Sequence, residues 1–208
     1  MVFIGICGAS GSGKTTLAKE LCRAIGASSA LLNQDAYYLD HPELTFEERT
    51  KLNYDEPFIF DHDLLYQDAR MLMAGQSVTR KAYRKAYDFT QHRRTESSEI
   101  IKPADVLIVE GIHAFFDERL TKMMFLKLYI NVEPDICLLR RIKRDIRDRG
   151  RQIENIGEQY LTTVKPMYEK YIRNYVNDAD VIVTRGGKNA RIVEILAGYL
   201  RDELNKKA

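Results

Sequence analysis

The sequence of 208 residues predicts an α/β fold, with a parallel sheet covered by helices on both faces. Short apolar runs typical of buried strands alternate with longer amphipathic stretches, and a glycine-rich turn separates the first apolar run from the first helical stretch. The sequence shows no repeat or linker that would divide it. We therefore expect one domain over residues 1–208, with a small β-hairpin insertion and an arginine-bearing lid.

Apolar runs bounded by turn-forming residues predict the strands, and amphipathic stretches predict the helices. Strands are expected at 2–7, 29–34, 105–110, 125–132 and 179–184. Helices are expected at 13–25, 61–74, 134–149, 156–176 and 189–204. Gly75 and Gly150 are suited to helix ends, and Pro134 to the first turn of a helix, which supports these boundaries.

Two segments depart from this alternation. Residues 35–60 are aromatic, acidic and poorly periodic, so we expect a long loop with a short helix near 45–51. Loops of this length in a compact domain are often functional. Residues 78–101 are rich in Tyr, Thr and Val without a helical stripe, which predicts a β-hairpin or small antiparallel insertion.

The composition excludes several classes of protein. Hydrophobic residues make up 45% and charged residues 30%, so the chain can build a core, and the net charge of +2 does not demand a nucleic acid or an anionic membrane. The sequence contains no apolar run near the ~20 residues that span a bilayer and no signal peptide. Cys7, Cys22 and Cys137 are widely spaced, which favours free thiols and a cytoplasmic location.

Residues 8–15, GASGSGKT, match the phosphate-binding loop pattern G-x-x-x-x-G-K-[ST] between a strand and a helix. Lys14 is expected to reach the β- and γ-phosphates of a nucleotide, Thr15 to bind Mg²⁺ and Thr16 to contact the α-phosphate. The remaining loop residues are expected to surround the phosphates with backbone N–H groups: Gly8, Ala9, Ser10, Gly11, Ser12 and Gly13. The motif predicts a P-loop NTPase-type sheet that binds ATP or GTP with Mg²⁺.

Two carboxylates are expected at the carboxyl ends of strands, where open α/β sheets bind ligands. Asp35 directly follows the second predicted strand, and Glu110 ends the third. Asp35 suits a catalytic base that accepts the proton of an acceptor hydroxyl, and Glu110 suits a residue that holds Mg²⁺ through its water shell. These carboxylates turn a nucleotide-binding prediction into a kinase hypothesis.

The predicted helix 134–149 and the residues after it are rich in arginine. Arg140, Arg144, Arg147 and Arg151 follow a spacing of four, three and four, which predicts one face, opposite a stripe of Leu138, Ile142 and Ile146. A basic face is often only solvated, but arginines also suit phosphoryl transfer because their planar fork binds phosphate oxygens. We expect a lid at about 147–157 that excludes water from the site.

The ordered motifs of the chain resemble those of the uridine kinase (uridine–cytidine kinase) family of P-loop kinases. Besides the P-loop, they are QDAYY at 34–38, NYDEP at 53–57, YDFTQH at 87–92, EGIHAFF at 110–116, RRIKRDIRDRGR at 140–151, QYLTTVKPMYEKYI at 159–172 and ADVIVTRGGKN at 179–189. The resemblance implies ATP-dependent phosphorylation of the 5′-hydroxyl of uridine, and of cytidine, in pyrimidine salvage. It also implies a homo-oligomer, often a tetramer.

The resemblance further implies roles for single residues. Asp35 matches the base on the ribose 5′-hydroxyl, Asp55 a ligand of the ribose hydroxyls, and Tyr87 with His92 the pair that recognises the pyrimidine base. The remaining matches are catalytic Arg144, the substrate-side residues Arg141, Arg151 and Gln159, and the ATP-side residues Arg149 and Lys188.

Two alternatives remain open. Ala36, Glu56 and His113 depart from the residues usual in relatives, so the acceptor could be another nucleoside, a sugar phosphate or a pantothenate-like acid. Basic residues that could bind an anionic acceptor are Arg80, Lys81, Arg84, Lys85, Arg93 and Arg94. A nucleic-acid-associated ATPase is disfavoured, because the sequence shows no oligonucleotide-binding motif.

Overall fold

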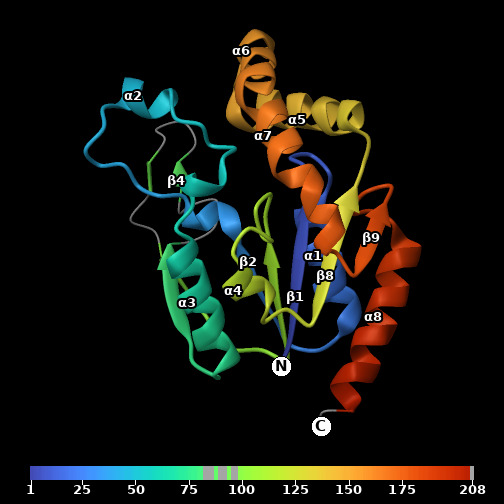
Figure 1. Ribbon diagram of the computed structural model, residues 1–208. Helices are drawn as coiled ribbons and strands as arrows, with labels where there is room; N and C mark the ends of the chain where they lie inside the picture. The colour runs from blue at the N-terminus through green and yellow to red at the C-terminus, as the bar shows by residue number, and fades with distance from the viewer. Residues whose placement is uncertain (82–86, 89–92, 95–97, 207–208) are drawn as a thin grey trace.

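The computed structural model describes residues 1–81, 87–88, 93–94 and 98–206. Its centre is a five-stranded sheet in the order β2-β7-β1-β8-β9, and every neighbouring pair is parallel (Figure 1). The strands are β1 (Val2–Gly8), β2 (Ser29–Asn33), β7 (Val106–Glu110), β8 (Leu126–Asn131) and β9 (Val181–Thr184). The predicted parallel α/β fold is confirmed.

Helices cover both faces of the sheet. Alternate residues of β1 point in opposite directions, so Ile4 and Ile6 join one buried cluster while Phe3 and Cys7 join the other. The first cluster is completed by α1 (Lys14–Ile25) and α8 (Ala190–Asn205). The second is completed by α3 (His62–Met73), the short α4 (Glu118–Thr121), which the sequence did not predict, and the 3₁₀ segment η4 (Ile172–Asp178).

The long segment after β2 has the predicted character. It contains the 3₁₀ turns η1 (Gln34–Tyr37) and η2 (Pro57–Ile59) and the short helix α2 (Phe46–Thr50). Thr45 and Glu48 begin α2 with a capping box, in which each side chain accepts from the other's backbone N–H. The loop therefore runs from the end of β2 over the carboxyl edge of the sheet.

The insertion after α3 is antiparallel, as predicted. Strand β3 (Val78–Lys81) pairs with β6 (Ser98–Ile101), and β4 (Tyr87–Asp88) pairs with β5 (Arg93–Arg94). Residues between and around these short strands lie outside the described part of the chain.

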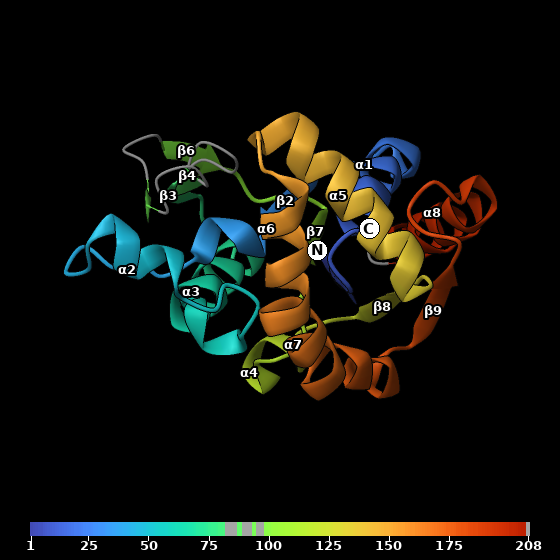
Figure 2. The ribbon, with the colours of Figure 1, turned by 90° about the horizontal axis from the view of Figure 1, so that it is seen from above.

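Helix α5 (Pro134–Arg149) carries Leu138, Ile142 and Ile146 at the predicted spacing, but this stripe is not the buried side of the helix. Its buried residues are Cys137, Arg141 and Asp145, whereas Ile146 is 46% exposed. Figure 2, which looks down on the carboxyl edge of the sheet, shows that α5 crosses this edge and does not lie along a face. The inward side of α5 therefore faces polar groups, which explains why its buried side is charged.

The helix predicted at 156–176 is divided into four pieces. They are α6 (Ile153–Gln159), a π-helical turn at Tyr160–Val164, α7 (Lys165–Lys170) and η4. Pro166 explains the break, because it lacks an N–H and its ring would clash with the carbonyl four residues earlier. The wider turn places Thr163 toward the site described next.

Among the described residues, none of the helices combines the length and apolar character that would carry it across a membrane.

Candidate active site

The glycine-rich loop between β1 and α1 is packed from two sides. Gly11 and Gly13 have φ values of 85° and 105°, which favour glycine. A Cβ atom on Gly11 would collide with the carbonyl of Cys137 in α5, and one on Gly13 would lie 2.8 Å from the backbone nitrogen of Gly187. The loop therefore has the shape of a phosphate cradle whose position is fixed by α5 and by the segment after β9.

Lys14 and Thr15 begin α1 directly after this loop. The Lys14 Nζ donates to the Ala9 carbonyl at 3.0 Å, so the side chain folds back across the loop. The Thr15 hydroxyl donates to the Glu110 carboxylate at 2.7 Å. Ser12 is fully buried, and its hydroxyl has no hydrogen-bond partner among the described residues.

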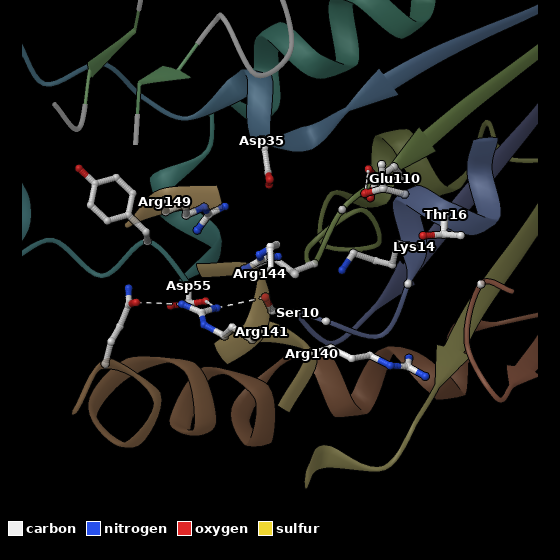
Figure 3. A pocket seen from close by; sticks show the side chains of 18 of the residues that line it. Ser10, Lys14, Thr16, Asp35, Asp55, Glu110, Arg140, Arg141, Arg144 and Arg149 are labelled. Atoms are coloured by element: carbon white, nitrogen blue, oxygen red, sulfur yellow. Dashed lines mark hydrogen bonds and ion pairs between the residues drawn. The ribbon is translucent and has the colours of Figure 1, made fainter. Parts of the chain in front are cut away.

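A cavity of about 610 Å³ lies over the loop and the carboxyl ends of β2 and β7 (Figure 3). It collects most of the residues predicted for the site: Ser10, Gly11, Gly13, Lys14, Thr15, Thr16, Asp35, Asp55, Glu110, Arg141, Arg144, Arg149, Arg151, Gln159 and Lys188. Gly8, Ala9 and Ser12 belong to the loop but do not line the cavity. His92, and the side chain of Tyr87, lie outside the described residues.

The two predicted carboxylates lie on neighbouring strand ends. Figure 3 shows Asp35 pointing into the cavity, with Glu110 beside Thr16 and Lys14 at its far side. Glu110 is only 2% exposed. Burial raises its pKa to about 7, helped by the nearby charge of Asp35 and opposed by Lys14. A cation bound near Glu110 would favour the ionised carboxylate.

Asp55 is held from several directions. Its carboxylate accepts from the Thr163 hydroxyl at 3.1 Å, and its other oxygen lies 3.7 Å from a guanidinium nitrogen of Arg141. The Asn53 side chain accepts from the Asp55 backbone N–H at 3.1 Å. The residue is buried but lines the cavity, so its carboxylate is a hydrogen-bond acceptor held in a fixed position at the cavity wall.

The arginines of α5 are organised by Asp145, a residue that the sequence did not single out. Its fully buried carboxylate lies 2.8 Å from Arg144, 3.4 Å from Arg149, 3.6 Å from Arg141 and 3.8 Å from Arg151. Burial acts to raise the pKa of Asp145, but the charges of Arg144, Arg149 and Arg141 outweigh it and lower the pKa overall. Asp145 is therefore ionised and holds these guanidinium groups over the cavity.

Gln159, the last residue of α6, binds two of these arginines. Its Oε1 accepts from Arg141 at 2.9 Å and from Arg151 at 2.6 Å, and Arg141 also donates to the Ser10 hydroxyl at 3.1 Å. In Figure 3 a dashed line joins Arg141 to Ser10 of the glycine-rich loop. One hydrogen-bonded network therefore connects α6, the arginines and the glycine-rich loop.

Arg147 and Arg80 do not belong to the site. Arg147 was predicted on the same face as Arg140 and Arg144, but its side chain is 79% exposed and pairs with Asp148 at 2.6 Å. Arg80, suggested for an anionic acceptor, is buried, pairs with Glu99 at 2.9 Å and donates to the Leu31 carbonyl. The side chains of Lys81, Arg84, Lys85, Arg93 and Arg94 lie outside the described part of the chain.

His113 lies behind the cavity wall. Its Nε2 donates to the Asp55 carbonyl at 2.8 Å, and its Nδ1 accepts from the Tyr175 hydroxyl at 2.9 Å, an assignment of the tautomer that follows from these partners. Burial lowers the pKa of His113 to about 4, so the ring is neutral. Neither His113 nor the other departures, Ala36 and Glu56, is among the described residues that line the cavity.

Further residues that line the cavity were not assigned a role in the site from the sequence. They are Tyr38, Tyr54, Gly111, Ile112, Arg140, Arg185 and Gly187. The rings of Tyr38 and Tyr54 meet edge to face at 5.6 Å. The aromatic character of the loop 35–60 was a signal for these tyrosines, and the arginine spacing was a signal for Arg140. Arg185 lies in the motif ADVIVTRGGKN at 179–189, from which only Lys188 was assigned a role.

Comparisons with known proteins decide the family. The model of the phosphoribulokinase / uridine kinase family matches residues 3–191. A protein named uridine kinase from Geobacillus kaustophilus is 41% identical over all 208 residues, covering 97% of that relative, and one from Staphylococcus haemolyticus is 42% identical over 205 residues, 98% of this chain and 97% of the relative. The chain belongs to the phosphoribulokinase / uridine kinase family.

Solved structures share the fold of this family member at lower identity. A putative fructose transport system kinase from Silicibacter sp. TM1040 has a TM-score of 0.68 at 20% identity, covering 87% of this chain and 88% of that one. Phosphoribulokinase from Rhodobacter spheroides has a TM-score of 0.65 at 15% identity, covering 88% and 69%. Membership in a family of kinases implies a nucleotide phosphate donor, in agreement with the cradle and the arginines.

Proposed function

We propose that this chain is a uridine kinase that transfers the γ-phosphoryl group of ATP to the 5′-hydroxyl of uridine, and of cytidine, as a step of pyrimidine salvage in the cytoplasm. The observation that carries the proposal is one cavity that contains both a phosphate loop and a carboxylate for an acceptor, Asp35. The names of the full-length relatives supply the nucleoside.

The donor half of the cavity suits a nucleotide triphosphate with Mg²⁺. Gly11 and Gly13 let the loop pack closely against α5 and the segment after β9. The backbone N–H groups of this loop can surround phosphates, and Lys14 needs only to release the Ala9 carbonyl to reach one. The Thr15 hydroxyl and the Glu110 carboxylate would hold Mg²⁺, which when bound neutralises charge on the phosphate oxygens. Lys188 lines the same cavity, consistent with a contact to the adenine.

The acceptor half suits a ribonucleoside. Asp35 would accept the proton of the 5′-hydroxyl while the 5′-oxygen forms a bond to the γ-phosphorus of ATP. The bond between that phosphorus and the bridging oxygen breaks, which releases ADP. Asp55, held by Thr163 and close to Arg141, would accept hydrogen bonds from the ribose hydroxyls. Arg144 and Arg149 would contact the transferring phosphate from α5, with Asp145 fixing their position.

Roles for Tyr87 and His92 in base recognition, a lid movement over 147–157, and a homo-oligomer remain predictions from the family resemblance. The alternative of an anionic acceptor loses one of its proposed cations, because Arg80 is buried against Glu99. The names of the full-length relatives favour the neutral nucleoside as the acceptor.

The proposal is tested by an acceptor screen with ATP and Mg²⁺. Uridine, cytidine, adenosine, ribulose 5-phosphate, pantothenate and a sample without acceptor are compared by ADP release and product mass. We expect phosphorylation of uridine and cytidine well above the others. Activity confined to a non-nucleoside acceptor would support a kinase but contradict the proposal of a nucleoside as its acceptor. ATP hydrolysis without any phosphorylated product would contradict both the kinase and the nucleoside.

A further inference from the structure

Asn33 connects the two carboxylates of the site. It is the last residue of β2 and lies directly opposite Glu110, the last residue of β7, in the parallel register. The residue is 2% exposed. Its Nδ2 donates to Glu110 Oε1, and its Oδ1 accepts from the backbone N–H of Asp35 at 2.9 Å. One small side chain thus contacts both the metal-side and the acceptor-side carboxylate residues.

The amide of Asn33 has only one suitable orientation. Rotating it by half a turn would place its N–H₂ against the N–H of Asp35 and its oxygen against the carboxylate of Glu110, so both contacts would become repulsive. A carboxylate at this position would keep the bond from Asp35 but lose the bond to Glu110. The bond to Glu110 therefore requires an amide at position 33, whereas the bond from Asp35 requires only an acceptor oxygen.

The bond from Asn33 also fixes which Glu110 oxygen faces the cavity. Both Asn33 Nδ2 and the Thr15 hydroxyl donate to the same oxygen, Oε1. Among the described residues, none donates a hydrogen bond to Oε2. The carboxylate is consequently held by one oxygen and keeps the other for a ligand or its water.

A simpler explanation is that Asn33 only begins η1, because its Oδ1 accepts from Asp35 as an N-cap does. Capping needs the oxygen alone, and elsewhere in the chain a carboxylate serves this purpose: Asp61 begins α3 by accepting from the Leu64 N–H. The donor half of the Asn33 amide is not needed for a cap. Capping alone therefore does not explain why the Asn33 Nδ2 donates to Glu110.

We propose that Asn33 is a positioning residue that couples Glu110 to Asp35, holding the metal-side carboxylate in place while it fixes the backbone from which Asp35 reaches the acceptor. The inference rests on the proposed function for the separate roles of these two carboxylates. It requires no particular nucleoside, because the bond from Asn33 to Glu110 concerns the donor side of the cavity.

The test separates the two halves of the amide. Asn33→Asp keeps the cap and removes the donor to Glu110, and Asp61→Asn exchanges the same groups at a cap outside the cavity. Binding of ADP is measured by titration calorimetry with and without Mg²⁺, and kcat is measured with ATP, Mg²⁺ and uridine. We expect Asn33→Asp to reduce the Mg²⁺-dependent gain in ADP affinity and kcat by about tenfold or more, as is usual when an outer-shell partner of a metal ligand is lost.

Asn33→Asp also places a second carboxylate against buried Glu110, so its melting temperature should fall. Asn33→Ser removes the donor without adding a charge, so its Mg²⁺-free ADP affinity and melting temperature should stay near those of the parent, and Asp61→Asn should match the parent throughout. If Asn33→Asp does not fold, Asn33→Ser takes its place, because serine also caps well but cannot span both partners. A full Mg²⁺-dependent gain and an unchanged kcat would overturn the coupling. If the parent phosphorylates no nucleoside but Asn33→Asp still loses the Mg²⁺-dependent gain in ADP affinity, the coupling of Asn33 to Glu110 is supported and the proposed acceptor is wrong.

Discussion

Asp145 shows how a single buried acid can organise several cations. The carboxylate is surrounded by Arg141, Arg144, Arg149 and Arg151, and its backbone carbonyl also accepts from the N–H of Arg151 at 3.1 Å. Without this negative charge, guanidinium groups so close together would repel one another. The arginines can therefore be in place before a nucleotide binds, which lowers the cost of organising the site.

Asp145→Asn should be costly because it leaves buried arginines without their counter-charge. We expect a loss of roughly 3 kcal/mol or more in the free energy of unfolding, as when one partner of a buried ion pair is removed. The KM for ATP should also rise. Asp148→Asn on the same helix is the matched control, since its partner Arg147 is exposed and the change should cost about 0–1 kcal/mol. Equal effects of the two variants in chemical denaturation would contradict this role of Asp145.

Asp35→Asn should separate chemistry from binding. The amide keeps the size of the side chain but cannot take the acceptor's proton, so kcat should fall by ~10²-fold or more while ATP affinity is retained. Lys14→Ala should instead weaken ATP binding with every acceptor, because it removes the phosphate-binding amine. Steady-state kinetics together with ATP titration check both. A normal kcat in Asp35→Asn would remove Asp35 from the reaction.

His113 predicts a pH dependence of stability. Its pKa is lowered from 6.5 to about 4 in the folded state, so the unfolded chain binds a proton first as the pH falls. Its contribution is therefore fully present above pH 6.5 and is lost as the pH falls toward 4, by roughly 3 kcal/mol in total.

His113→Gln tests this contribution, because the amide can replace both hydrogen bonds without titrating. The free energy of unfolding of the variant should fall less steeply between pH 6.5 and 4 than that of the parent. Burial also lowers the pKa of His62, so the comparison between parent and variant is needed to isolate His113. Identical slopes would show that His113 does not carry the effect.

Single-residue roles were predictable where a motif fixes them. Lys14, Thr15 and Asp35 follow from the phosphate loop and from a strand end, and the structure places them in one cavity. Asn33 and Asp145 could not be found this way. Their roles come from contacts with Glu110 and with neighbouring arginines, which no local pattern contains.

At the level of elements, α5 is where the sequence reasoning was least accurate. Its apolar residues Leu138, Ile142 and Ile146 have helical spacing, which ordinarily marks a core-facing stripe. The helix lies instead across the carboxyl edge of the sheet. Its buried side carries Arg141, which lines the cavity, and Asp145, which pairs with Arg141. Periodicity reports that a helix is amphipathic, but it does not say whether the inward face is apolar.

The turn at Gly150, after α5, offers a test of how the backbone positions Arg149 and Arg151. Gly150 ends α5 with φ 62°, and Gly26 ends α1 with φ 72°; a Cβ atom at either position would meet no atom within 4 Å. Gly150→Ala and Gly26→Ala should each lower the free energy of unfolding by about 1 kcal/mol from backbone strain alone. Only Gly150→Ala should raise the KM for ATP, because it displaces Arg149 and Arg151. Equal KM values in both variants would contradict this expectation.

The molecule as a whole gathers its chemistry at one edge of the sheet. Figure 1 shows α5, α6 and α2 beyond the ends toward which the strands point, and the amino terminus and the end of α8 at the opposite end. Parallel strands force this arrangement, since every β-to-α connection leaves from the same edge. The sequence predicted the edge because Asp35, Glu110 and the P-loop all follow strands. It could not predict how deep each side chain lies, which depends on packing across distant segments.

The position of the transferred phosphate on uridine shows whether Asp35 and the phosphate loop act on the 5′-hydroxyl. Uridine is incubated with ATP, Mg²⁺ and the protein, and the product is identified by mass and by ³¹P-coupled NMR. We predict uridine 5′-monophosphate with one ADP released per product, because Asp35 faces the cavity beside the phosphate loop. Phosphate on the 2′- or 3′-oxygen, or release of ADP with uridine unchanged, would contradict this account.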